Sequence, residues 1–422
     1  MHLRDFIKAG HTPSLISAFL YFDISFMIWV LLGSLVNEIA PELQLTNSQR
    51  GYVLAMAPLG GAFLRIILGI LSDYIGPKRT GILGMAFTLV PLVLGWQWAD
   101  SFTKLIIVGL LLGFAGASFA VALPMASRWY PPKYQGLALG IAGAGNSGTA
   151  FATLFGPILA KEIGWHAVFA LALIPLGLVF IFFTTFAKDA PNQPKPKSAG
   201  EYFQVLSQRD AWLFCIFYTV TFGGFLGFCL FLNTYFVKQF SVSKITAGYL
   251  ATACVISGSF VRPIGGYLAD RFGGVTMLSI LFFAIGASMG FLALGLPIYL
   301  ALPVLFMAMA FFGMGNGSVF QLVPLRFPRE IGILTGLAGA AGGMGGFFLN
   351  IILGNIKDLT NSYAWGFAIF SAVAFFNGVV VLALGKAWIA QPGVQPAVPG
   401  CEPETVPPIA QASPIGEVSS PA

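Results

Sequence analysis

Charge is scarce in this chain of 422 residues. Only 9% of the residues are Asp, Glu, Lys or Arg, whereas 57% are hydrophobic, and the mean hydropathy is +0.83. A soluble domain carries about 25% charged residues, so the composition excludes a soluble globular fold. Apolar runs of the ~20 residues that cross a bilayer recur along the chain. Inside lipid such runs must be helical, because their backbone has no other hydrogen-bond partners. The sequence therefore predicts an all-α polytopic membrane protein.

Cysteine and histidine are also scarce. The four cysteines, three in apolar runs and one in the C-terminal tail, are Cys215, Cys229, Cys254 and Cys401. Their spacing fits no metal site, and we interpret them as small packing residues. The three histidines, all near the ends of apolar runs, are His2, His11 and His166. No nucleophile stands beside a base, so the sequence predicts no enzyme, no catalytic residue, no metal site and no cofactor.

Apolar runs, by contrast, are abundant and long. Twelve are predicted to cross the membrane, at 14–36, 50–72, 80–97, 103–125, 134–159, 165–187, 211–237, 244–270, 275–295, 298–322, 331–356 and 363–388. The first run is too long for the apolar core of a signal peptide and lacks a convincing small-residue cleavage site, so we interpret it as a membrane helix.

A polar stretch divides the twelve spans into six and six. Residues 188–210, KDAPNQPKPKSAGEYFQVLSQRD, form the longest polar segment between apolar runs. We expect an N-terminal six-helix half at 1–187, a cytoplasmic linker at 188–210 and a C-terminal six-helix half at 211–390. The tail at 391–422 is rich in Pro, Ala, Val and Ser, cannot bury a core, and is predicted to be disordered.

The two halves repeat each other. The fourth and tenth spans correspond, as GFAGASFAVALP and GMGNGSVFQLVP, and a shift of 197 residues aligns the second span with the eighth. The pairs that this shift matches include Gly61 with Gly258, Arg65 with Arg262, and Asp73 with Asp270. Two parallel six-helix repeats are typical of one large class of secondary transporters, which hold the substrate between the halves near the middle of the bilayer.

The positive charges follow the positive-inside rule. Of the 22 Lys and Arg residues, 14 fall in segments on the side of the termini and the linker, and six fall on the other side. This asymmetry predicts a multi-pass protein of the plasma (inner) membrane with both termini in the cytoplasm. The net charge of +6 therefore needs no nucleic-acid partner. The two remaining arginines, Arg65 and Arg262, lie within predicted spans.

Arg65 stands in the apolar stretch GGAFLRIILG, where its charge costs a few kcal/mol unless it faces a cavity or the interior of the bundle. Asp73 lies roughly 12 Å further along the helix axis, too far to pair with it. The repeat places Arg262 at the equivalent depth, so two guanidinium groups can converge on a planar oxyanion. The alternative is that each arginine reaches the cytoplasmic surface or caps backbone carbonyls between helices.

Glycine-rich stretches, GLALGIAGAGNSG at 136–148 and GILTGLAGAAGGMGG at 332–346, let helix backbones approach closely. Asn146 is the polar exception in the first stretch, since its amide offers two donors and an acceptor at lipid depth. It either contacts a ligand or makes a hydrogen bond between helices.

These motifs, AGAGNSG at 142–148, GGMGG at 342–346 and the paired arginines, resemble the nitrate/nitrite porter family of the major facilitator superfamily, over all twelve spans. The loop motif of the superfamily is complete in GYLADRFG at 266–273, whereas GILSDYIG at 69–76 has Tyr74 in place of the basic residue. That departure weakens inference about gating in the first half.

The resemblance implies that Arg65 and Arg262 clamp the anion, that Asn146 lies close to it, and that Phe119 and Phe320 flank its two faces. The remaining implied positions are Tyr218 and Phe222, which line the cavity, and Gly145, Gly148, Gly342 and Gly345, which pack at the site. For each aromatic residue, the alternative is lipid contact or core packing.

The expected mechanism is rocking of the two halves, with Asp73, Asp270 and Arg271 closing the cytoplasmic side, although both aspartates could instead cap helix ends. Closing an empty site would strand two arginine charges, which favours nitrate/nitrite exchange. Three alternatives stay open: proton-coupled nitrate symport through Asp23, antiport of another small anion such as oxalate or formate, and a channel or sensor. The expected partners are nitrate, nitrite and membrane lipid, and the chain is expected to be a monomer.

Overall fold

The computed structural model describes residues 3–191, 199–327 and 331–389, which form helices and no strand. The predicted tail at 391–422, with Cys401, lies outside the described residues. The helices of the N-terminal half are α1 (Leu3–Ala9), α2 (Thr12–Trp29), α3 (Leu31–Glu42), α4 (Asn47–Ile75), α5 (Pro77–Gln97), α6 (Phe102–Gly116), α7 (Phe119–Arg128), α8 (Pro132–Gly143), η1 (Ala144–Ser147), α9 (Gly148–Ile163) and α10 (Trp165–Phe186). A short helix, α11 (Ala199–Leu206), lies within the predicted linker. The C-terminal half contains α12 (Arg209–Phe240), α13 (Lys244–Phe260), α14 (Arg262–Phe272), α15 (Gly274–Ala293), α16 (Ile298–Arg326), α17 (Ile331–Thr360) and α18 (Ala364–Ile389).

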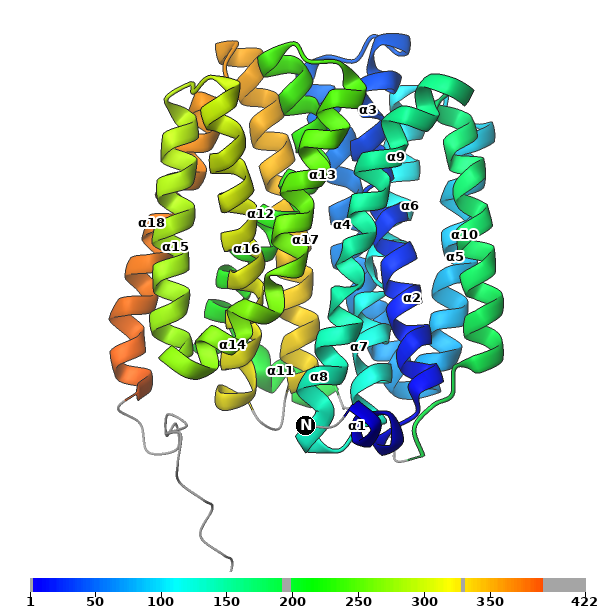
Figure 1. Ribbon diagram of the computed structural model, residues 1–422, viewed down its shortest axis with the longest axis vertical. Helices are drawn as coiled ribbons and strands as arrows, with labels where there is room; N and C mark the ends of the chain where they lie inside the picture. Colours follow the sequence, from blue (N-terminus) through cyan, green and yellow to red (C-terminus); the bar gives the residue numbers. More distant parts are fainter. Residues whose placement is uncertain (1–2, 192–198, 328–330, 390–422) are drawn as a thin grey trace, which may run out of the picture.

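The predicted all-α polytopic fold is confirmed. Eleven helical segments of the described chain are long and apolar enough to cross a membrane, and they correspond to eleven of the twelve predicted spans. The remaining predicted span, 134–159, is formed by α8, η1 and α9 in succession. The halves lie side by side, with α1 and α11 at the same end of the bundle (Figure 1). We call this end the linker end.

Four spans are broken, where the sequence indicated continuous helices. The interruptions lie at Val30, at Ala117–Ser118, at η1 and at Val261. The last has a local cause, since Pro263 occupies the first turn of α14, where its missing N–H is tolerated but would break a helix interior. Arg262 therefore begins a new helix, whereas its repeat partner Arg65 lies inside the continuous α4.

Matched glycines bring the helices of each half together. A Cβ on Gly60 of α4 would collide with α6, and a Cβ on Gly113 of α6 would collide with α4. In the other half the same relation holds between Gly258 of α13 and Gly313 of α16. The internal repeat of the sequence thus corresponds to a repeated backbone contact, in which glycine is required by the space and not by its conformation.

The two halves are joined at the end opposite the linker. Lys244 at the start of α13 forms an ion pair with Glu38 of α3 at 2.6 Å. About two turns further into the bundle, the hydroxyls of Thr153 on α9 and Thr252 on α13 are 2.8 Å apart and join the halves again. A further contact joins the start of α4 to the last turn of α17, where the side chain of Asn47 donates to Asp358 at 2.8 Å. We call this end the far end.

The glycine contacts give a stability prediction. Replacing Gly113 by Ala should lower the melting temperature in detergent, because overpacking costs about 1–3 kcal/mol. The control is Gly177→Ala in α10, where a Cβ meets nothing within 4 Å; it should be neutral or stabilising by about 0.5–1 kcal/mol. Equal melting temperatures for the two variants would contradict the packing argument.

Candidate functional site

Arg65 is buried between the halves, with 1% of its surface exposed. One terminal nitrogen, Nη2, donates to the carbonyl of Gly116 at 2.8 Å, and the other, Nη1, donates to the carbonyl of Gly339 at 2.7 Å. Gly116 is the last residue of α6, so its carbonyl is unused by the helix and lies at the negative end of the helix dipole. Gly339 belongs to α17 of the other half. Arg65 thus caps carbonyls between helices, which was one of the two alternatives drawn from the sequence.

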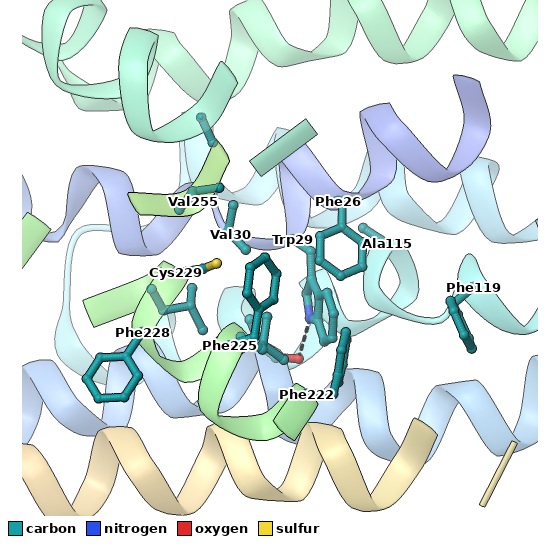
Figure 2. Packing of buried hydrophobic residues seen from close by; sticks show 14 of the residues in the cluster. Phe26, Trp29, Val30, Ala115, Phe119, Phe222, Phe225, Phe228, Cys229 and Val255 are labelled. Atoms are coloured by element: carbon teal, nitrogen blue, oxygen red, sulfur yellow. Dashed lines mark hydrogen bonds between the residues drawn. The ribbon is translucent and has the colours of Figure 1, made fainter. Parts of the chain in front are cut away.

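Aromatic rings surround the Arg65 guanidinium. Its central carbon lies 5.0 Å from the ring centre of Phe119, 5.4 Å from that of Phe222 and 5.5 Å from that of Trp29. Figure 2 shows Trp29 and Phe222 beside each other, with the indole N–H hydrogen-bonded to a carbonyl oxygen, that of Ala57 at 2.7 Å. These distances are within the range of cation–π attraction. The charge of Arg65 is therefore balanced by dipoles and ring faces, with no carboxylate among its described partners.

Arg262 is less completely satisfied than Arg65, whose Nε alone has no hydrogen-bond partner among the described residues. Its Nη2 lies 3.4 Å from the hydroxyl of Tyr218, a long hydrogen bond, and its central carbon is 5.8 Å from the ring centres of both Phe119 and Phe320. Its Nη1 is buried and has no hydrogen-bond partner among the described residues. A buried unpaired donor of this kind costs free energy, and a bound anion would relieve that cost.

One aromatic cluster connects the two arginines. Phe119 lies within cation–π range of both guanidinium groups, and its ring centre is 6.1 Å from that of Phe320. Tyr218 stacks on Phe222 at 5.0 Å and meets Phe320 edge to face at 4.9 Å. The structure thus brings together the two arginines and the four aromatic residues that the sequence pointed to.

Asn146 lies in η1 and is buried, and no hydrogen bond joins it to either arginine in the described structure. Both polar atoms of its amide lack a hydrogen-bond partner among the described residues. The neighbouring glycines explain its position: a Cβ on Gly145 would meet Phe22 at 2.8 Å, and one on Gly148 would collide with Asp23. Its closeness to the anion remains a prediction, while its two unpaired groups indicate room for a polar partner.

The glycines of α17 pack against the aromatic cluster. A Cβ on Gly342 would lie 2.7 Å from Phe222 and 3.0 Å from Tyr218, and one on Gly345 would lie 2.9 Å from Gly223 of α12. These positions keep α17 close to α12 and fix the rings of the site.

Asp23 of α2 is 6% exposed, and Ser147 donates to it at 2.8 Å. It is the one fully buried carboxylate in the described chain. Its hydrogen bond between helices is the alternative to proton coupling that the sequence left open. The ring centre of Phe22, the residue before Asp23, lies 5.5 Å from that of Phe119, so the carboxylate belongs to a helix that contacts the aromatic cluster.

The predicted gating residues lie at the linker end. Asp73 forms an ion pair with Arg128 of α7 at 2.7 Å, within the same half. Asp270 and Arg271, near the end of α14, are exposed. Arg128 thus provides a basic partner for Asp73 even though Tyr74 replaces the basic residue of the loop motif.

Three parts of the site escaped the sequence analysis: Trp29 and the carbonyls of Gly116 and Gly339. The sequence carried no specific signal for Trp29. Cβ atoms on Gly61 and Gly116 would both collide with its indole, but in the sequence these glycines equally indicate close packing of helices. The carbonyl contacts carried no signal, because every residue has a carbonyl.

The chain is also similar to known proteins over most of its length. The profile of the Major Facilitator Superfamily matches residues 16–350. The chain is 32% identical over 361 residues to the "Nitrite extrusion protein" of Bacillus subtilis (strain 168), covering 85% of this chain and 90% of that protein. It is 30% identical over 407 residues to the "Probable nitrate/nitrite antiporter NarK1" of Thermus thermophilus, covering 88% and 89%. It is 32% identical over 361 residues to the "Probable nitrate transporter NarT" of Staphylococcus haemolyticus (strain JCSC1435), covering 84% and 92%.

The site predicts anion-dependent stability. Nitrate, nitrite or formate should raise the melting temperature of the wild type, because binding to the folded state stabilises it by RT ln(1 + [L]/Kd). Gly339→Ala should abolish the rise, because the new Cβ would lie 2.9 Å from the Arg65 side chain. The control is Gly336→Ala, one turn earlier in α17, where a Cβ meets nothing within 4 Å. An unchanged rise in Gly339→Ala would remove Arg65 from the site.

Proposed function

The chain belongs to the nitrate/nitrite porter family of the major facilitator superfamily, and we propose that it carries nitrate and nitrite across the membrane by exchange. The observation that carries this proposal is a pair of guanidinium groups, Arg65 and Arg262, joined by an aromatic cluster. No carboxylate is a described partner of either group. Two fixed positive charges without counter-charge favour an anion, and the walls formed by Phe119 and Phe320 favour a small one.

Alternating access follows from the position of the site between the halves. Arg65 on α4 and Arg262 on α14 belong to different halves, so rocking of one half against the other changes which end of the bundle the anion can reach. The ion pair between Asp73 and Arg128 and the exposed Asp270 and Arg271 would then control the linker end. We propose that this end faces the cytoplasm of a plasma-membrane protein, and that a single chain suffices, since one chain supplies both arginines.

Exchange is favoured by the unpaired Nη1 of Arg262. In an empty carrier this donor stays buried without a partner, whereas a carrier that holds nitrate or nitrite satisfies it on every crossing. The loaded carrier should therefore reorient faster than the empty one. The relatives whose names refer to extrusion of nitrite and to nitrate/nitrite antiport are consistent with this proposal.

Flux into proteoliposomes tests the function. Nitrate uptake should require nitrite inside the vesicles and should not respond to a proton gradient. Arg65→Lys should lose at least about tenfold in transport, because an ammonium cannot donate in-plane paired hydrogen bonds to two oxygens. The control is Arg209→Lys, which conserves the same charge at an exposed position at the start of α12 and should transport normally.

Two outcomes would contradict the proposal. Uptake into empty vesicles that follows the proton gradient would assign the protein to proton-coupled symport. Absence of nitrate flux in wild-type vesicles, with flux of formate or oxalate instead, would assign it to another anion.

Asp23 allows the coupling mechanism to be tested separately. Because exchange needs no proton carrier, Asp23→Asn should preserve nitrate/nitrite exchange and abolish any proton-driven uptake. The control Asp100→Asn alters a carboxylate whose side chain is 69% exposed. If proton-driven uptake and exchange both persist in Asp23→Asn, Asp23 is not the coupling residue.

A further inference from the structure

We propose that the N-terminus of α4 is a second anion-binding site, at the far end of the pathway, which the Asp358 carboxylate fills while that end is closed. Asp358 lies on α17 and α4 belongs to the other half, so the two separate when the far end opens. The site then takes a small planar oxyanion. The choice of nitrate as this anion rests on the proposed function.

The Asp358 carboxylate is held by donors at the first turn of α4. The backbone N–H of Ser48 donates to it at 2.6 Å and the Asn47 amide at 2.8 Å, and the Ser48 hydroxyl donates as well. The next free N–H of the helix, that of Gln49, is already taken by Thr46 in a capping box. The Ser48 N–H is therefore a helix-end donor that α4 itself leaves unsatisfied, and such donors bind anions.

Arg50 supplies an independent indication of a ligand. It is 8% exposed, and only its Nε donates, to the carbonyl of Leu45 at 3.4 Å. No described residue accepts a hydrogen bond from its two terminal nitrogens. Arg50 lines a cavity with Asn47, Gly354, Thr234 and Tyr363. These two nitrogens therefore offer donors to an acceptor in the cavity, and the burial of most of the side chain makes such a hydrogen bond stronger than one at an open surface.

The cavity is closed against anions in this state. Its volume is about 10 Å³, the space of a single water, so an oxyanion enters only when α4 and α17 part. Close backbone packing keeps them together, because a Cβ on Gly354 would lie 3.1 Å from Gly51 of α4. Lys238 and Lys357 add positive charge around Asp358. When Asp358 moves away with α17, the positive charge of Arg50 on α4 would be left without this neighbouring carboxylate.

An anion from solution resembles the Asp358 carboxylate that it would replace. A carboxylate, nitrate and nitrite are all planar, singly charged and able to accept hydrogen bonds through two neighbouring oxygens. An anion from solution can therefore take over the donors that Asp358 releases. By binding only the open far end, it shifts the population toward that state. The second site would link the arrival of an anion to the opening of the path toward Arg65.

Disulfide formation across the far end tests this proposal. Thr153→Cys and Thr252→Cys are introduced together, after the native cysteines have been replaced by Ala, since the parent hydroxyls are 2.8 Å apart in the closed state. Arg262→Gln is added to disable the central site. Nitrate should slow disulfide formation about fivefold when its concentration is several times the Kd of the second site. Chloride at the same ionic strength should have a much smaller effect.

Variants of the second site distinguish binding from simple loosening. Ser48→Ala combined with Arg50→Gln should abolish the effect of nitrate. Glu38→Gln breaks the ion pair with Lys244. It should slow disulfide formation in the absence of nitrate, but nitrate should slow the reaction further by the same factor as in the parent. Asp358→Asn should move the response to lower nitrate concentrations, because the competing carboxylate is gone.

The proposal is overturned if nitrate has no effect in the Arg262→Gln background, or if the Ser48→Ala, Arg50→Gln variant responds as its parent does. An equal effect of chloride would also overturn it, since that result indicates charge screening. The measurement is repeated with Arg65→Lys in place of Arg262→Gln, so that a folding defect caused by one of these substitutions cannot decide the result. A nitrate response in a protein whose wild type transports no nitrate would overturn the proposed function and leave the second site supported.

Discussion

A guanidinium charge buried between the halves is the constraint on which the rest of the structure depends. Arginine stays protonated in proteins, so the cost of burying Arg65 has to be met by its surroundings. The fold meets it by ending α6 at Gly116, which frees a carbonyl at the negative end of a helix. It adds the carbonyl of Gly339 and three aromatic faces. The helix break and the close approach of α17 are therefore parts of one electrostatic arrangement.

The same solution recurs at the far end. In both places a cation or a donor of one half is satisfied by an oxygen of the other half: Arg65 by the Gly339 carbonyl, and the start of α4 by Asp358. This revises the argument from sequence that an empty carrier strands two arginine charges, because both terminal nitrogens of Arg65 keep their partners without any anion and only its Nε is unpaired in the described chain. The preference for exchange rests instead on Arg262, whose Nη1 has no partner in the described chain.

The sequence was sufficient for features that depend on composition and periodicity. Length and hydropathy predicted the spans, and the repeat predicted that Arg65 and Arg262 would converge, as both do around Phe119; that they bind one anion stays a prediction. The four aromatic residues around them were predicted only from the resemblance to the family. With 41 phenylalanines in the chain, composition alone could not single out the ones at the site. The break before Arg262 could have been predicted from Pro263. The break after Gly116 and the bond to Gly339 could not, because they depend on distances between helices that local sequence does not encode. Asn146 shows the same limit, since no hydrogen bond joins it to the arginines in the described structure.

The arrangement of the rings bears on which anion fits. The five N–H donors of a guanidinium lie in its plane, while Phe119, Phe222 and Trp29 lie within cation–π range of Arg65. An acceptor makes paired hydrogen bonds with a guanidinium only if its own oxygens lie in that plane, and the rings limit the room around the group. Phe119 and Phe320 bring the same restriction to Arg262. We therefore propose that a planar anion of three or four atoms is preferred at both arginines over a tetrahedral or bulkier one, which would have to displace the rings that balance the charge.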